Sequence, residues 1–70
     1  MEYFEVGYER DGFFSINMIK GTFESAQLIA EKHAKKHGYK VAYLNKVDES
    51  YAESQIAKGM PLIVAEKYLS

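Results

Sequence analysis

The segment Glu9-Arg10-Asp11-Gly12-Phe13 constrains the fold more than any other part of the chain, because it sets the register of the residues on either side. The apolar residues alternate with polar ones before and after it, which predicts a β-hairpin. A two-residue Asp-Gly loop would place Tyr8 opposite Ser15, whereas a three-residue loop ending at Gly12 places Tyr8 opposite Phe14. We favour the longer loop because it pairs apolar residues with one another, and a slip of one residue would turn every side chain over. The facing pairs are then Tyr8–Phe14, Val6–Ile16 and Phe4–Met18.

Glycine, proline and helix-capping residues divide the rest of the chain into further elements. Thr22 is a plausible N-cap and Gly38 a C-cap for a first helix, and Ser50 with Glu53 has the spacing of a capping box for a second. Pro61 prevents that second helix from continuing. The expected strands are 3–9, 13–20, 39–47 and 62–65, and the expected helices are 23–37 and 51–58.

This order, β-β-α-β-α-β, predicts a single α+β domain over residues 1–70, with two layers, one sheet, and both helices on one face. The connection through the first helix predicts that the third strand runs parallel to the second. The chain has 70 residues, of which 47% are hydrophobic, and no cysteine. It has no stretch of about 18 apolar residues and no basic start followed by an apolar run, so we expect a soluble cytoplasmic protein that does not enter membranes.

The charges are segregated although the net charge is only −1. Both ends of the chain are acidic, and the middle holds six of the lysines. Two acidic clusters are expected, one around the hairpin and one at the start of the second helix. They consist of Glu5, Glu9 and Asp11, and of Asp48, Glu49 and Glu53. Capping and solubility account for each cluster separately, but if the fold brings the two clusters together they would attract a basic groove and imitate DNA.

Candidate catalytic and metal-binding residues are few. His33 and His37 have the i,i+4 spacing of two metal ligands on a helix, but the sequence suggests no third ligand, so a structural role near the helix end is the simpler interpretation. No nucleophile is spaced with a base, and no glycine-rich phosphate loop follows a strand. We therefore expect no enzyme activity and no cofactor.

The lysines of the first helix are the candidate nucleic-acid contacts, namely Lys32, Lys35 and Lys36, together with Lys40. Direct nucleic-acid binding is disfavoured because Arg10 is the only arginine and the net charge is negative. The favoured register instead turns four apolar residues to the far face of the sheet: Tyr3, Phe13, Ile19 and Leu44. Such a face indicates a foreign protein partner, a homodimer, or cover by Tyr68 and Leu69 from the end of the chain.

The layout of the chain resembles that of small orphan proteins of phages and mobile elements in Gram-positive bacteria. The resemblance lies in the hairpin, in the helix opening at Gly21-Thr22-Phe23-Glu24-Ser25-Ala26, and in the closure at Lys58-Gly59-Met60-Pro61. That population includes anti-CRISPR inhibitors, so the resemblance implies a stoichiometric inhibitor of an RNA-guided nuclease, a type II CRISPR effector, acting in the bacterial cytoplasm. The alternatives are a small nucleic-acid-binding or regulatory module and a homo-oligomeric structural protein.

Overall fold

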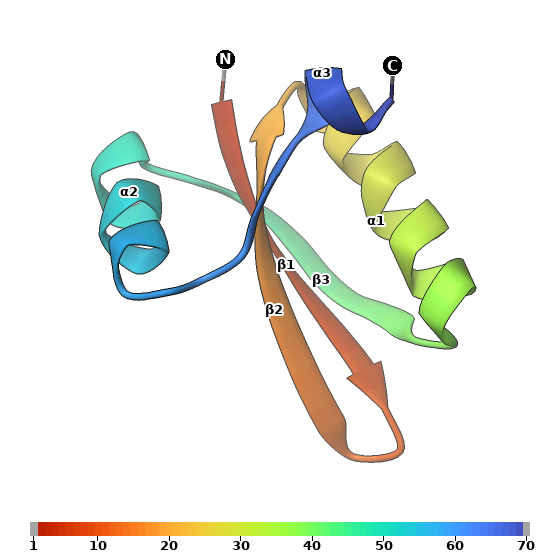
Figure 1. Cartoon of the computed structure of the whole chain (residues 1–70). Helices are drawn as coiled ribbons and strands as arrows, with labels where there is room; N and C mark the ends of the chain where they lie inside the picture. Colours follow the sequence, from red (N-terminus) through yellow and green to blue (C-terminus); the bar gives the residue numbers. More distant parts are fainter. Residues whose placement is uncertain (1, 70) are drawn as a thin grey trace.

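The computed structural model describes residues 2–69 and shows a four-stranded sheet with helices on both sides (Figure 1). The α+β class and the predicted succession of strands and helices are confirmed. A short helix that was not predicted follows the last strand. The elements are β1 (Glu2–Arg10), β2 (Phe13–Gly21), α1 (Phe23–His37), β3 (Lys40–Val47), α2 (Glu49–Ala57), β4 (Leu62–Val64) and α3 (Ala65–Tyr68).

The strand order in the sheet is β3-β1-β2-β4. Strand β1 is antiparallel to both of its neighbours, and β4 is parallel to β2. Strand β3 therefore runs in the same direction as β2, as predicted, but β1 lies between them. No helix in the part of the chain that the structure describes is long and apolar enough to cross a membrane.

The hairpin loop has two residues, so the three-residue loop favoured from the sequence is wrong. Asp11 and Gly12 both have positive φ, 50° and 85°, as a type I′ turn requires, and this turn matches the twist of the strands it joins. Tyr8 consequently lies opposite Ser15 rather than Phe14. The prediction assumed that only one face of the hairpin would be covered. Both faces are covered, so Met18 and Ile19, which face opposite ways, are each fully buried.

Helix α1 covers the sheet face that carries Phe4 and the other even-numbered apolar residues of β1, as the sequence predicts. Its buried positions are mostly alanine, which lets the helix lie close to the strands; the cluster contains Phe4, Val6, Tyr8, Ile19, Ala26, Ile29, Ala30, Ala34 and Ala65. The Thr22 side chain accepts the backbone N–H of Ser25 at 3.1 Å, which confirms the N-cap. Gly38, with φ of 74°, confirms the C-cap.

Helix α2 lies on the opposite face of the sheet, so the prediction that both helices share one face is wrong (Figure 1). The odd-numbered residues of β1 and the even-numbered residues of β2 supply a second core beneath it, which contains Tyr3, Met18 and Ala52 with Val47, Ile56 and Met60 around them. The helix begins at Glu49 with Asp48 as its N-cap residue, and the expected capping box of Ser50 and Glu53 does not form.

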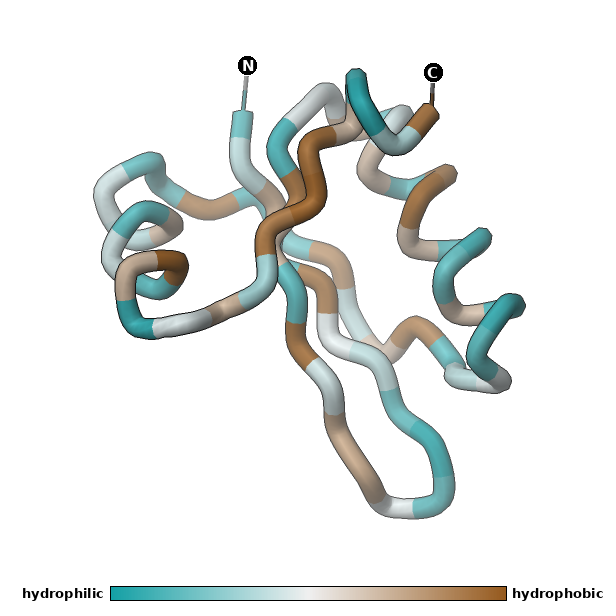
Figure 2. The backbone as a smooth tube through the Cα atoms, in the orientation of Figure 1, coloured by the Kyte–Doolittle hydropathy of each residue, from teal (hydrophilic) through white to brown (hydrophobic). Residues whose placement is uncertain are grey.

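The β1–β2 hairpin extends beyond both helices as an arm (Figure 1). In Figure 2 strongly apolar residues gather along β4, the strand paired with β2, and the turn at the end of the arm is polar. The arm therefore presents both of its faces and one edge to solvent over its last few residues. These surfaces carry the side chains of most interest for binding.

Candidate interaction surface

The half of the α2-side sheet face nearest the hairpin turn is not covered by α2. Glu9 and Phe14 face each other across β1 and β2, and Ile16 follows two residues along the same face. Phe14 is 62% exposed and Ile16 is 38% exposed. We call the surface formed by Glu9, Phe14 and Ile16 the hairpin face. Exposed apolar side chains beside a carboxylate are typical of a protein-binding surface.

The Tyr43 ring closes the inner side of the hairpin face by lying directly on Gly7. A Cβ atom added to Gly7 would sit 2.2 Å from Cε2 of Tyr43, so only glycine leaves room for the ring here. Gly7 and Tyr43 are opposite one another in the β1–β3 pairing, and the register shifts between Gly7 and Tyr8. The ring is thereby fixed between the open half of the face and the half beneath α2.

A pair of tyrosine hydroxyls binds the Glu5 carboxylate and ties α2 to the sheet. The Tyr43 hydroxyl donates to Oε2 of Glu5 at 2.5 Å, and the Tyr51 hydroxyl donates to Oε1 at 2.6 Å. Burial, followed by the bond to Glu5, raises the pKa of Tyr43 to about 12, and the bond to Glu5 also raises the pKa of Tyr51. Both oxygens of Glu5 already accept hydrogen bonds within the protein. Glu5 therefore has a structural role, although the sequence analysis placed it among the partner-binding residues.

The apolar far face expected from the sequence does not exist as one surface. Ile19 is fully buried beneath α1, and Tyr3 is 8% exposed beneath α2, with the Lys20 ammonium 5.6 Å from its ring centroid. Leu44 packs half-buried against the α1-side core. Phe13 is 75% exposed, but it pairs with Arg10 on the α1 side of the arm. The two-residue loop moves Phe13 and Ile19 to the α1 side, because it turns the side chains of β2 over relative to the favoured register. Tyr3 is buried for a different reason, because α2 covers the face that carries it.

Glu9 and Asp11 of the first acidic cluster lie at the opposite end of β1 from the second cluster, whereas Glu5 lies between the two ends and is bonded to Tyr51 of α2. Glu9 and Asp11 are exposed at the hairpin turn, whereas α2 starts next to Val47, which pairs with Tyr3 at the other end. Glu9 lies six residues further along the strand than Tyr3, a distance of roughly 20 Å. Asp48, Glu49 and Glu53 are exposed there. The clusters therefore do not form one continuous acidic surface, although Glu9 and the start of α2 belong to the same side of the sheet.

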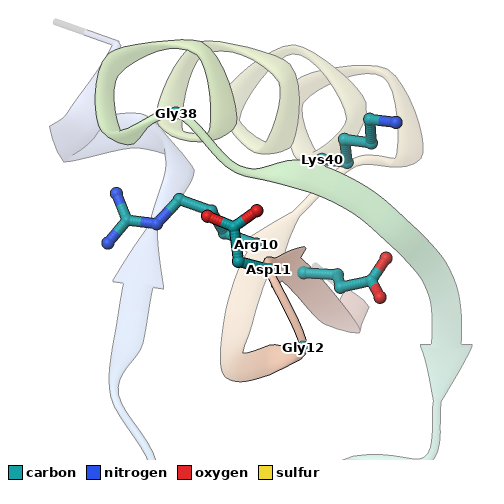
Figure 3. Close-up of a pocket in the computed structure, with 6 residues that line it drawn as sticks. Arg10, Asp11, Gly12, Gly38 and Lys40 are labelled. Carbon is teal, nitrogen blue, oxygen red and sulfur yellow. The ribbon is translucent and has the colours of Figure 1, made fainter.

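A hollow beside the hairpin turn is lined by Glu9, Arg10, Asp11, Gly12, Gly38 and Lys40 (Figure 3). Arg10 donates from Nη1 to the carbonyl oxygen of His37 at 3.0 Å, and its guanidinium lies 5.1 Å from the Tyr39 ring centroid. Lys40 lies opposite Glu9 in the β1–β3 pairing. The lining is mixed in charge and holds no apolar side chain, so the hollow does not suit the mostly apolar small molecules that fill ligand pockets.

The exposed face of α1 carries Lys32, Lys35 and Lys36 on the side of the sheet away from the hairpin face. The rings of His33 and His37 lie 4.5 Å apart, centroid to centroid. Among residues 2–69, no group of three His, Asp or Glu side chains is placed to hold a metal ion. His33 also packs on the Tyr8 ring at 5.0 Å. Burial, with the charges of His37 and Lys36 adding to it, lowers the pKa of His33.

Phe14 and Ile16 are the surface residues that the sequence reasoning missed, because the favoured register placed them in the core. Asp-Gly between two apolar alternations is the strongest short hairpin signal, and giving it priority would have exposed both. No known family, characterised protein or solved structure shows significant similarity to this chain. The candidate surface rests on the geometry of this chain alone.

Proposed function

We propose that this protein is a non-enzymatic inhibitor that binds another protein through the hairpin face. The observation that carries the proposal is the exposure of Phe14 and Ile16 beside Glu9 on an arm that extends past both helices. Strand β3 still pairs with β1 at Glu9, through Lys40, so the arm is two strands wide only beyond Glu9 and Phe14, and its type I′ turn gives that end a defined shape. An aromatic anchor with a charged neighbour is a common centre of binding energy in such contacts.

The proposed partner is a type II CRISPR effector nuclease, whose basic DNA-binding surface the arm would occupy. Glu9 and Asp11 would guide the arm toward lysine and arginine, and the apolar residues would supply the affinity. The α1 lysines would not oppose this approach, because α1 lies on the other side of the sheet. Arg10 is also turned toward the end of α1 by its bond to the His37 carbonyl.

The direct test is DNA cleavage by purified type II effectors of Gram-positive bacteria, loaded with guide RNA, with and without excess inhibitor. We expect binding to the effector and loss of cleavage. Phe14→Ser should weaken binding by roughly 30-fold, as truncation of a binding hot spot does. Leu28→Ser is the matched control, because Leu28 is 44% exposed on α1, outside the hairpin face, and its loss should leave binding unchanged.

A second pair of variants tests the charges. Glu9→Gln with Asp11→Asn should slow association, and asparagine keeps the positive φ that residue 11 adopts. Glu24→Gln with Glu31→Gln changes the net charge equally on α1 and should have no effect. Cleavage that persists with every effector at saturating protein would refute the inhibitor proposal. Recovery from lysate of nucleic acid that depends on Lys32, Lys35 and Lys36 would favour a nucleic-acid-binding module instead.

A further inference from the structure

We propose that two copies of this chain associate through the open edge of β2, with their arms antiparallel and Phe14 opposite Phe14 of the second copy. This proposal goes beyond the inhibitory function and does not rest on it. The occupant of the edge is a second copy of the same chain, and the contact joins the two sheets edge to edge.

Strand β4 covers only part of the β2 edge. It pairs with Met18, Ile19 and Lys20, so within the described residues no strand pairs with the outer side of 13–17. The Met18 N–H donates to the Pro61 carbonyl oxygen at 2.8 Å, which shows that Met18 directs its backbone groups away from β1. Because backbone direction alternates along a strand, Phe14 and Ile16 also direct their N–H and C=O groups to the open edge.

The open edge lacks the features that keep β-strands apart. Its sequence from Phe13 to Asn17 holds no charged residue and no proline. The opposite edge of the sheet, β3, carries Lys40 and Lys46, and lysine on an edge discourages pairing with another strand. The two edges therefore differ, and the β2 edge is the one built to accept another strand.

Symmetry and charge favour a second copy as the occupant. Pro61 blocks the edge at Met18, and the turn ends it at Gly12, so the free stretch is 13–17. Of its two outward-directed residues, Phe14 is the one farther from Pro61, so a two-fold axis at Phe14 keeps the second copy clear of the blocked end. An antiparallel copy related by a two-fold axis at Phe14 would exchange both backbone hydrogen bonds of that residue with its mate. Two neutral strands meet without like-charge repulsion, and the two exposed Phe14 rings would cover each other on the α2 side.

The test is the mass of the full chain in solution, measured by light scattering during size-exclusion chromatography over a range of concentrations. We expect a dimer that dissociates on dilution. Ile16→Lys should give a monomer with an unchanged circular dichroism spectrum. Val41→Lys is the matched control, because Val41 is also 38% exposed but lies on β3, at the other edge, and this variant should remain dimeric.

A cysteine variant checks the register without relying on a charged substitution. The chain has no cysteine, so Phe14→Cys places one thiol on each copy. Directly opposed residues in a hydrogen-bonded antiparallel pair have Cα atoms about 5.5 Å apart, within the range of a disulfide. Oxidation should link the Phe14→Cys copies and leave Val41→Cys unlinked.

Two results would overturn the dimer: a wild-type monomer up to the solubility limit, or a dimer that Val41→Lys disrupts and Ile16→Lys does not. Because the dimer covers Phe14, which the proposed inhibitor contact also uses, inhibition would be carried by the monomer and does not require the dimer. Failure of the dimer is therefore distinguishable from failure of the inhibitor.

Discussion

Replacing Gly7 with alanine tests whether the Tyr43 ring is held where the structure places it. The new Cβ atom would meet Cε2 of Tyr43 at 2.2 Å, so the ring must move off β1. That movement breaks the 2.5 Å hydrogen bond from the Tyr43 hydroxyl to Glu5. A hydrogen bond to a charged acceptor contributes about 1.5–3 kcal/mol, whereas alanine is better than glycine in a strand by roughly 0.5–1 kcal/mol.

The net loss expected for Gly7→Ala is therefore about 1–2 kcal/mol in the free energy of unfolding. For a domain of this size that corresponds to a fall of roughly 5–15 °C in Tm. Urea unfolding followed by circular dichroism, together with a thermal melt, measures both quantities. Gly12→Ala is a comparison variant at the hairpin turn, where no atom lies within 4 Å of the added Cβ. Any loss of stability in that variant comes from its φ of +85° and not from a steric clash.

The decisive control is Gly7→Ala in a Tyr43→Ala background. Without the ring there is nothing to displace, so the same substitution should stabilise the protein by roughly 0.5–1 kcal/mol. The effect of Gly7→Ala thus changes sign between the two backgrounds, with a coupling free energy of about 2 kcal/mol. An equal loss in both backgrounds would refute the reasoning, since the cost would then come from the β1 backbone and not from Tyr43.

Three further predictions concern stability. Burial is the main cause that raises the pKa values of Tyr8 and Tyr43 to about 12, so the folded protein favours their neutral form. The free energy of unfolding should therefore fall as the pH rises from 10 to 12, and tyrosine absorbance during alkaline unfolding measures that fall. The pKa of His33 is lowered, so the stabilisation that comes from its neutral ring is present above about pH 6.5 and lost as the pH falls. His33→Gln should therefore flatten the fall in the free energy of unfolding below about pH 6.5. Thr22→Ala removes the α1 cap and should cost about 1 kcal/mol in urea unfolding, whereas exposed Gln27→Ala should not.

Local signals in the sequence determined most of the elements. Thr22 and Gly38 set the limits of α1, because capping chemistry acts within one turn of a helix. The helical repeat correctly predicted the buried alanines of α1. The predicted start of β3 differs from the observed start by a single residue. Such features depend on neighbours a few residues away, so the sequence carries them directly.

Only the tertiary structure decided which side of the sheet each helix covers. The pattern of β2 is apolar at both Met18 and Ile19, and this fits one covered face or two. We assumed one covered face. That assumption led to the wrong hairpin register, to the apolar far face that does not exist, and to the wrong side of the sheet for α2. The structure resolves it because α2 buries Met18 while α1 buries Ile19. The exposure of Phe14 and Ile16 follows from how far α2 reaches along the sheet, a long-range packing outcome that no local pattern encodes.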